Sequence, residues 1–118
     1  MDEMFLEMVV PKDASKIAKF YAKDFLLFTN GTSMTYDEYV TMHERVYATP
    51  IAYTYRIEEE TVVEGDDSVG ARVFITTQMP GEAPREIEVV LLAKYRGGLL
   101  HRLWELTWPD WTKAKEFQ

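Results

Sequence analysis

The sequence predicts an α+β fold in which helices pack on one face of a mostly antiparallel sheet. Apolar residues recur at helical spacing before Pro50, and the pattern after Pro50 is extended, as in β-strands. Short turns rich in glycine, proline or aspartate separate the extended segments, which favours hairpins between neighbouring strands. Helices that come first and strands that follow are typical of the α+β class.

Two short helices are predicted at the start of the chain. The first has Met4, Phe5, Met8 and Val9 as its apolar stripe, preceded by Asp2 and Glu3, and Pro11 ends it, because proline cannot continue the hydrogen-bond ladder of a helix. Asp13 is a good N-cap for the second helix, which we expect to end near Lys23.

The third predicted helix has well-marked boundaries. Thr35 and Glu38 form a capping box, in which each side chain bonds to the backbone N–H of the other residue. We expect the helix to run to about Ala48, since Pro50 stops it. Its apolar face consists of Tyr36, Tyr39, Val40, His43, Val46 and Tyr47.

One short and four long strands are predicted. The run 25–29 is a compact β-type segment, and Asn30-Gly31 after it is a strong turn signal. The long strands cover residues 51–63, 68–79, 85–96 and 99–108. We expect these four strands to form an antiparallel meander, because their connections are short.

The last strand is apolar on both faces. One face carries Leu99, Leu103 and Thr107, and the other carries Leu100, Trp104, Leu106 and Trp108. A sheet with one solvated face does not have this pattern, and the helices cover only one side. We therefore predict a homodimer, with Trp104 and Leu106 near the contact.

Length, charge and cysteine content exclude several classes of protein. A chain of 118 residues fits one domain, residues 1–118, and its net charge of −7 would repel the phosphates of a nucleic acid. The absence of cysteine excludes disulfides and suits a reducing compartment, so we expect a cytoplasmic protein. No apolar run approaches the ~20 residues that span a bilayer. Two histidines without a carboxylate cluster make a weak metal site, and we expect neither metal nor cofactor.

The closing segment Gly98-Leu99-Leu100-His101-Arg102-Leu103-Trp104-Glu105-Leu106 resembles a recurring strand of the SnoaL-like branch of the nuclear transport factor 2-like superfamily. The resemblance extends from Ile17 to Trp111 and includes the order of the elements. It implies a cone-shaped roll, in which a strongly curved sheet holds the N-terminal helices in its concave face and encloses an apolar cavity. This scaffold hosts isomerases, cyclases, epoxide hydrolases and binding modules.

Glu105 is the first catalytic candidate, because a buried carboxylate in an apolar strand needs a partner or a raised pKa. A structural ion pair, or an edge position reached by water, explains it equally well. Arg72 also interrupts an apolar strand, and we expect it to pair with Glu105 across the cone and tune its charge.

Two activities of the superfamily are not expected. In the limonene epoxide hydrolase branch, an arginine, an acid two residues after it and an acid on the last strand activate water. Arg72 and Glu105 match two of these groups, but Phe74 replaces the middle acid. Ketosteroid isomerase has an aspartate base near a place where this chain has Thr29 and Asn30, neither of which is a base.

His43 is the third catalytic candidate, since it has a near-neutral unperturbed pKa and faces the presumed cavity; a satisfied core histidine is the alternative. Asn30 is a candidate ligand-binding residue by its resemblance to the water-binding asparagine of the epoxide hydrolase branch, although a turn also explains it. Tyr53, Phe28 and Phe74 are candidate cavity aromatics, with ordinary core packing as the alternative.

Two functions therefore stay open. The first is a SnoaL-like domain that binds an unknown apolar small molecule and acts on an apolar carbonyl compound as a cofactor-independent isomerase or cyclase. The second is a non-catalytic dimerisation or ligand-binding module, which predicts a dry, packed interior.

Overall fold

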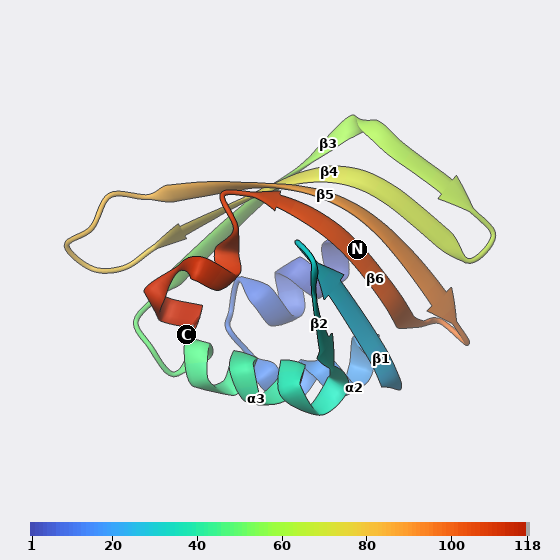
Figure 1. Ribbon diagram of the computed structural model, residues 1–118, viewed down its shortest axis with the longest axis horizontal. Coiled ribbons are helices and arrows are strands. Elements are labelled where there is room, and N and C mark those ends of the chain that lie inside the picture. Colours follow the sequence, from blue (N-terminus) through green and yellow to red (C-terminus); the bar gives the residue numbers. More distant parts are fainter. Residues whose placement is uncertain (118) are drawn as a thin grey trace.

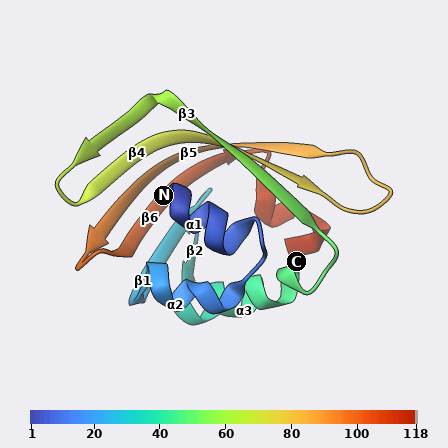
Figure 2. The ribbon, with the colours of Figure 1, turned by 180° about the vertical axis from the view of Figure 1, so that it is seen from behind.

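The computed structural model describes residues 1–117, and it shows a curved sheet arched over the helices (Figure 1). Seen from behind, α1 (Asp2–Met4) lies beneath the arch and α3 (Tyr36–Tyr47) runs below it (Figure 2). The α+β class, with helices in the concave face of a strongly curved sheet, is confirmed.

The remaining elements follow in chain order. The other helical segments are a π-helical turn (Phe5–Val9), a 3₁₀ turn (Ala14–Lys16), α2 (Ile17–Phe20) and two C-terminal 3₁₀ turns (Trp111–Lys113 and Lys115–Phe117). The strands are β1 (Tyr21–Thr29), β2 (Thr32–Thr35), β3 (Ala52–Gly65), β4 (Ser68–Gln78), β5 (Arg85–Arg96) and β6 (Leu99–Trp108).

The six strands form one sheet in the order β2-β1-β6-β5-β4-β3. The predicted meander of four long strands is confirmed, since β3, β4, β5 and β6 pair antiparallel in sequence order. The first strand, β1, then pairs parallel with the last, β6, and sets Thr29 beside Glu105. This pairing sets a strand from the first third of the chain beside the last strand.

The structure differs from the sequence prediction at two places near β1. The second helix ends at Phe20 and not near Lys23, because Tyr21 already enters the sheet. Strand β2 was not expected; it pairs with β1 across the turn at Asn30 and Gly31. Both turn residues have positive φ, 48° and 86°, as a tight hairpin turn requires.

A β-bulge in β6 changes the predicted face of Leu100. Lys94 of β5 pairs with Arg102 and Tyr95 pairs with Leu100, so His101 is the extra residue in β6. The bulge reverses the alternation, and Leu100, 4% exposed, therefore lies in the core with Leu103. Trp104, Leu106 and Trp108 keep the outer face predicted for them, with exposed fractions of 38%, 69% and 78%.

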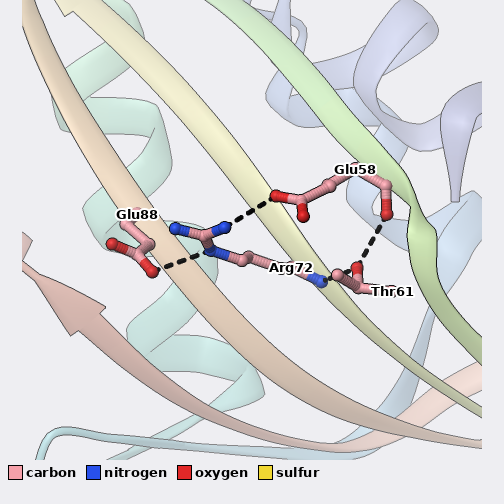
Figure 3. A network of polar contacts seen from close by, with 4 residues as sticks. All are labelled: Glu58, Thr61, Arg72 and Glu88. Carbon is pink, nitrogen blue, oxygen red and sulfur yellow. Dashed lines mark hydrogen bonds and ion pairs between the residues drawn. The ribbon is translucent and has the colours of Figure 1, made fainter.

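A second irregularity lies in edge strand β3, where the pairing with β4 shifts between Glu58 and Val63. Thr61 holds this bulge: its hydroxyl donates to the Glu58 carbonyl at 2.7 Å and accepts from the Arg72 backbone N–H at 2.9 Å (Figure 3). The hydroxyl thus replaces ladder hydrogen bonds that the bulge removes.

The core lies between the helices and the concave face of the sheet. Its most buried side chains include Met8, Ile17, Phe25, Val46 and Val73, each at most 1% exposed. Within residues 1–117, no helix has both the length and the apolar content needed to cross a membrane.

The predicted capping box of α3 is present. The Thr35 hydroxyl accepts from Glu38 N at 3.3 Å, and the Glu38 carboxylate accepts from Thr35 N at 3.0 Å. Hydrogen bonding of the Glu38 carboxylate by Thr35, first from its backbone N–H and then from its side chain, lowers the pKa of Glu38, because it favours the charged form. The helix that lines the concave face thus has a defined start.

Replacement of Thr35 tests this helix boundary. We expect Thr35→Ala to lower the free energy of unfolding by about 1 kcal/mol, since an orphan N–H of the first turn loses its acceptor. Urea unfolding followed by circular dichroism measures the loss. Thr35→Ser should keep most of the stability, and Thr41→Ala, at an exposed site of the same helix, is the control. A loss no larger than that of the control would contradict the role of the cap.

Candidate functional site

A cavity of about 140 Å³ lies between the concave face of the sheet, α3 and the N-terminal helical turns. One wall of the cavity is the sheet, and alternate residues of its strands point into the cavity because successive side chains lie on opposite faces. These residues are Val73, Ile75 and Thr77 of β4 and Val89 and Leu91 of β5. Most of the lining is apolar or aromatic, as in small-molecule sites. Cavities of about 150 Å³ hold a benzene-sized ligand.

Glu105 supplies a carboxylate to the cavity wall, in the middle of β6. Its Oε1 accepts from Trp111 Nε1 at 2.8 Å, and the same indole N–H lies 3.2 Å from Thr29 Oγ1. Burial raises the pKa of the Glu105 carboxyl, and hydrogen bonds from Trp111 and Thr29 offset only part of this effect. A carboxyl of this kind exchanges a proton more readily near neutral pH than an exposed one does.

The predicted pair of Arg72 and Glu105 is wrong. Arg72 donates to Glu58 Oε2 and to Glu88 Oε1, each at 2.8 Å, on the outer face of the sheet (Figure 3). The reason is strand alternation: Ala71 and Glu105 both pair with Leu91 and share the inner face, so Arg72, one residue along, lies on the other face.

Phe74 lies on the outer face with Arg72, and not in the cavity. The guanidinium groups of Arg56 and Arg72 lie 4.2 Å and 4.6 Å from the centre of its ring. The ring therefore forms cation–π contacts at the surface.

Phe28 and Asn30 also lie outside the cavity. Phe28 stacks on Trp104 on the outer face, with 5.7 Å between ring centroids. The Asn30 side chain donates to Thr107 Oγ1 at 2.6 Å and accepts from Thr107 N at 2.9 Å. Asn30 thus connects the end of β1 to β6. Phe28 and Asn30 line a depression on the outer face, together with Val90 and Leu106.

His43 and Tyr53 line the cavity, as the sequence predicts. His43 Nδ1 lies 2.9 Å from the Tyr39 carbonyl oxygen; since a carbonyl only accepts, Nδ1 carries the proton. Burial lowers the pKa of His43 to about 4, because removal from water disfavours the charged ring. The imidazole is therefore neutral near pH 7.

Tyrosines form much of the remaining polar lining. The Tyr21 and Tyr39 hydroxyls hydrogen-bond each other at 2.8 Å. The Tyr47 hydroxyl is buried and has no hydrogen-bond partner among residues 1–117. The sequence predicts Tyr39 and Tyr47 on the apolar face of this helix; their spacing of four residues on either side of His43 is the signal for one polar row on α3.

Residues 1–117 contain no group of three or more His, Asp or Glu side chains that are placed to hold a metal ion. The polar side chains that line the cavity include the Glu105 carboxyl, the neutral His43 imidazole and several phenolic hydroxyls.

Comparison with solved structures identifies the fold. A protein from Shewanella denitrificans assigned as a SnoaL-like polyketide cyclase matches with a TM-score of 0.72 and 13% identity, over 97% of this chain and 93% of that one. An epoxide hydrolase of M. tuberculosis described as LEH-like matches with a TM-score of 0.74 and 12% identity, over 90% and 78%. A protein from Rhodopseudomonas palustris assigned as an isomerase matches with a TM-score of 0.67 and 15% identity, over 92% and 87%.

No family model matches the chain, and no curated protein matches its sequence. The resemblance to the SnoaL-like branch is confirmed at the level of the fold: the chain has the cone-shaped, nuclear transport factor 2-like fold of these structures.

The lowered pKa of His43 predicts a pH dependence of stability. The folded-state value of about 4 lies below the ordinary value of 6.5, so the unfolded chain binds the proton first as the pH falls. The free energy of unfolding should therefore decrease from about pH 6.5 towards pH 4, by up to about 1 kcal/mol per pH unit from this group. Urea unfolding of the wild type and of His43→Gln at each pH isolates the effect. Parallel pH profiles for the two proteins would contradict it.

Proposed function

We propose that the chain binds a small apolar carbonyl compound in the cavity and moves a proton on it without a cofactor, as isomerases and cyclases do. The single observation that carries this proposal is the Glu105 carboxyl, with its raised pKa, on the wall of an otherwise apolar cavity. The fold supports this class of reaction, since proteins assigned as a cyclase and as an isomerase have the same fold.

We also propose a cytoplasmic location, which the lack of cysteine supports.

In this proposal, Glu105 acts as a general base and then as a general acid. Its carboxylate removes a proton from the carbon next to the carbonyl, and the electron pair of the C–H bond forms an enolate. The same carboxyl returns the proton to another atom of the ligand. Trp111 Nε1, 2.8 Å from Oε1, holds the carboxyl in place. Arg72 has no part in this step, because it lies on the outer face with Glu58 and Glu88.

A second, non-catalytic role is favoured by a different observation, the exposed apolar surface on the outer face. Val90, Leu92, Leu106 and Trp108 are 50% to 78% exposed there, and Trp104 adjoins them at 38%. We propose that a second copy of the chain covers this surface. Arg72 and Glu88 border this surface and already pair with each other, so the apolar side chains carry the proposed twofold contact.

Proton exchange on a simple ketone tests the catalytic proposal. Cyclohexanone in deuterated buffer should exchange its α-protons in the presence of the protein, measured by NMR. Glu105→Gln should slow the catalysed exchange by about 100-fold or more, since the amide is no base. The catalysed rate should rise with pH through the raised pKa of Glu105, because only the carboxylate removes a proton.

Glu86→Gln, at an exposed site of β5, is the matched control and should leave the rate unchanged. Circular dichroism shows whether Glu105→Gln is folded. An unchanged exchange rate in folded Glu105→Gln would overturn the role of Glu105 as the base.

Sedimentation velocity at micromolar concentration tests the dimer. The wild type should sediment as a dimer, and Leu106→Glu should sediment as a monomer, since a charge at the centre of an apolar contact is costly. Leu6→Glu changes a leucine of similar exposure, 61%, away from the outer sheet face and should stay dimeric. A monomeric wild type would contradict the proposal.

A further inference from the structure

The Tyr47 hydroxyl is a buried polar group without a protein partner. Its side chain is 9% exposed and lines the cavity, and no group among residues 1–117 hydrogen-bonds its oxygen. An unpaired buried hydroxyl costs free energy, so native proteins pair such groups with protein, water or ligand. Burial also raises the pKa of Tyr47, so the phenol keeps its proton and is available as a donor.

The neighbouring His43 offers the complementary group, an acceptor. Its Nδ1 proton is used by the Tyr39 carbonyl, and the ring is neutral near pH 7, so Nε2 carries a lone pair. No hydrogen bond to Nε2 is formed within residues 1–117.

The donor and the acceptor lie side by side on one helix. His43 and Tyr47 are one turn apart on α3, and their ring centroids are 5.2 Å apart with the planes at 80°. Both residues line the same cavity. A carbonyl oxygen between them would satisfy Tyr47 alone, and an ammonium group would satisfy His43 alone. A hydroxyl satisfies both, because it accepts one hydrogen bond and donates another.

We propose that His43 and Tyr47 form a subsite for the hydroxyl of a single-ring phenol or cyclic enol, which accepts from Tyr47 Oη and donates to His43 Nε2. This inference rests on the proposed ligand-binding function and adds a ligand class to it. The cavity volume of about 140 Å³ suits one ring, and the apolar strands β4 and β5 supply its walls. In the proton transfer assigned to Glu105, the ligand oxygen, as carbonyl or enolate, would accept from Tyr47 Oη at the same subsite.

Three probes of similar shape separate the two hydrogen bonds. Phenol both donates and accepts, anisole only accepts, and toluene does neither. Titration calorimetry should give phenol an affinity about tenfold above that of toluene in the wild type, with anisole in between. Tyr47→Phe should weaken phenol and anisole binding and leave toluene unchanged. His43→Leu should weaken phenol but not anisole relative to toluene.

Tyr36→Phe is the matched control, since Tyr36 lies on α3 and does not line the cavity. It should leave all three affinities unchanged. Tyr47→Phe should also unfold at the wild-type urea concentration or above, because it removes a hydroxyl that has no protein partner.

The outcomes separate this inference from the proposed function. Equal binding of phenol and toluene by the wild type would overturn the subsite and leave the apolar cavity as a ligand site; it would mean that water satisfies Tyr47. Phenol binding unaffected by Tyr47→Phe would overturn it as well. If none of the three probes binds, the cavity takes no ligand of this size, and the proposed function fails together with the subsite.

Discussion

The alternation of side chains along β4, β5 and β6 is the constraint on which the site depends. It turns Glu105 towards the cavity, and it turns Arg72, Phe74 and Leu106 away from it. A cation beside Glu105 would lower its pKa; the separation leaves burial as the dominant effect. The reactivity proposed for the carboxyl therefore follows from a one-residue offset between Arg72 on β4 and Glu105 on β6, the two strands that flank β5.

How far the sequence predicts this structure depends on the range of the interactions involved. The capping box of α3 and the turns between strands are local, and the elements that they bound were predicted well. The partners of Arg72 were not, because pairing with Glu58 and Glu88 depends on the register of three strands. The bulge at His101 likewise depends on pairing with β5, and no local sequence pattern predicts it.

For the site, strand alternation and helical spacing were sufficient to predict that Glu105, His43 and Tyr53 lie in the interior. The unpaired Tyr47 hydroxyl could not be predicted, because it depends on which groups surround it in the folded protein.

The cavity combines two kinds of polar group that act at different positions. Glu105 is held at one position by Trp111, and the row of Tyr39, His43 and Tyr47 faces it from α3. The Tyr39 hydroxyl has a hydrogen-bond partner in Tyr21, whereas the Tyr47 hydroxyl and His43 Nε2 have no partner among residues 1–117. A proton-transfer group and a recognition group can therefore be supplied by separate elements, a strand and a helix.

The bulge in β3 has a consequence for solubility. β3 is the outermost strand of the sheet, and its free edge would be a template for pairing with strands of other molecules. The shift between Glu58 and Val63, held by Thr61, interrupts that edge in its middle, and Glu59 and Glu60 within the shift are exposed. A second strand approaching this edge would meet a kinked backbone and like charges. The same irregularity that anchors the backbone of Arg72 thus protects the protein against edge-to-edge aggregation.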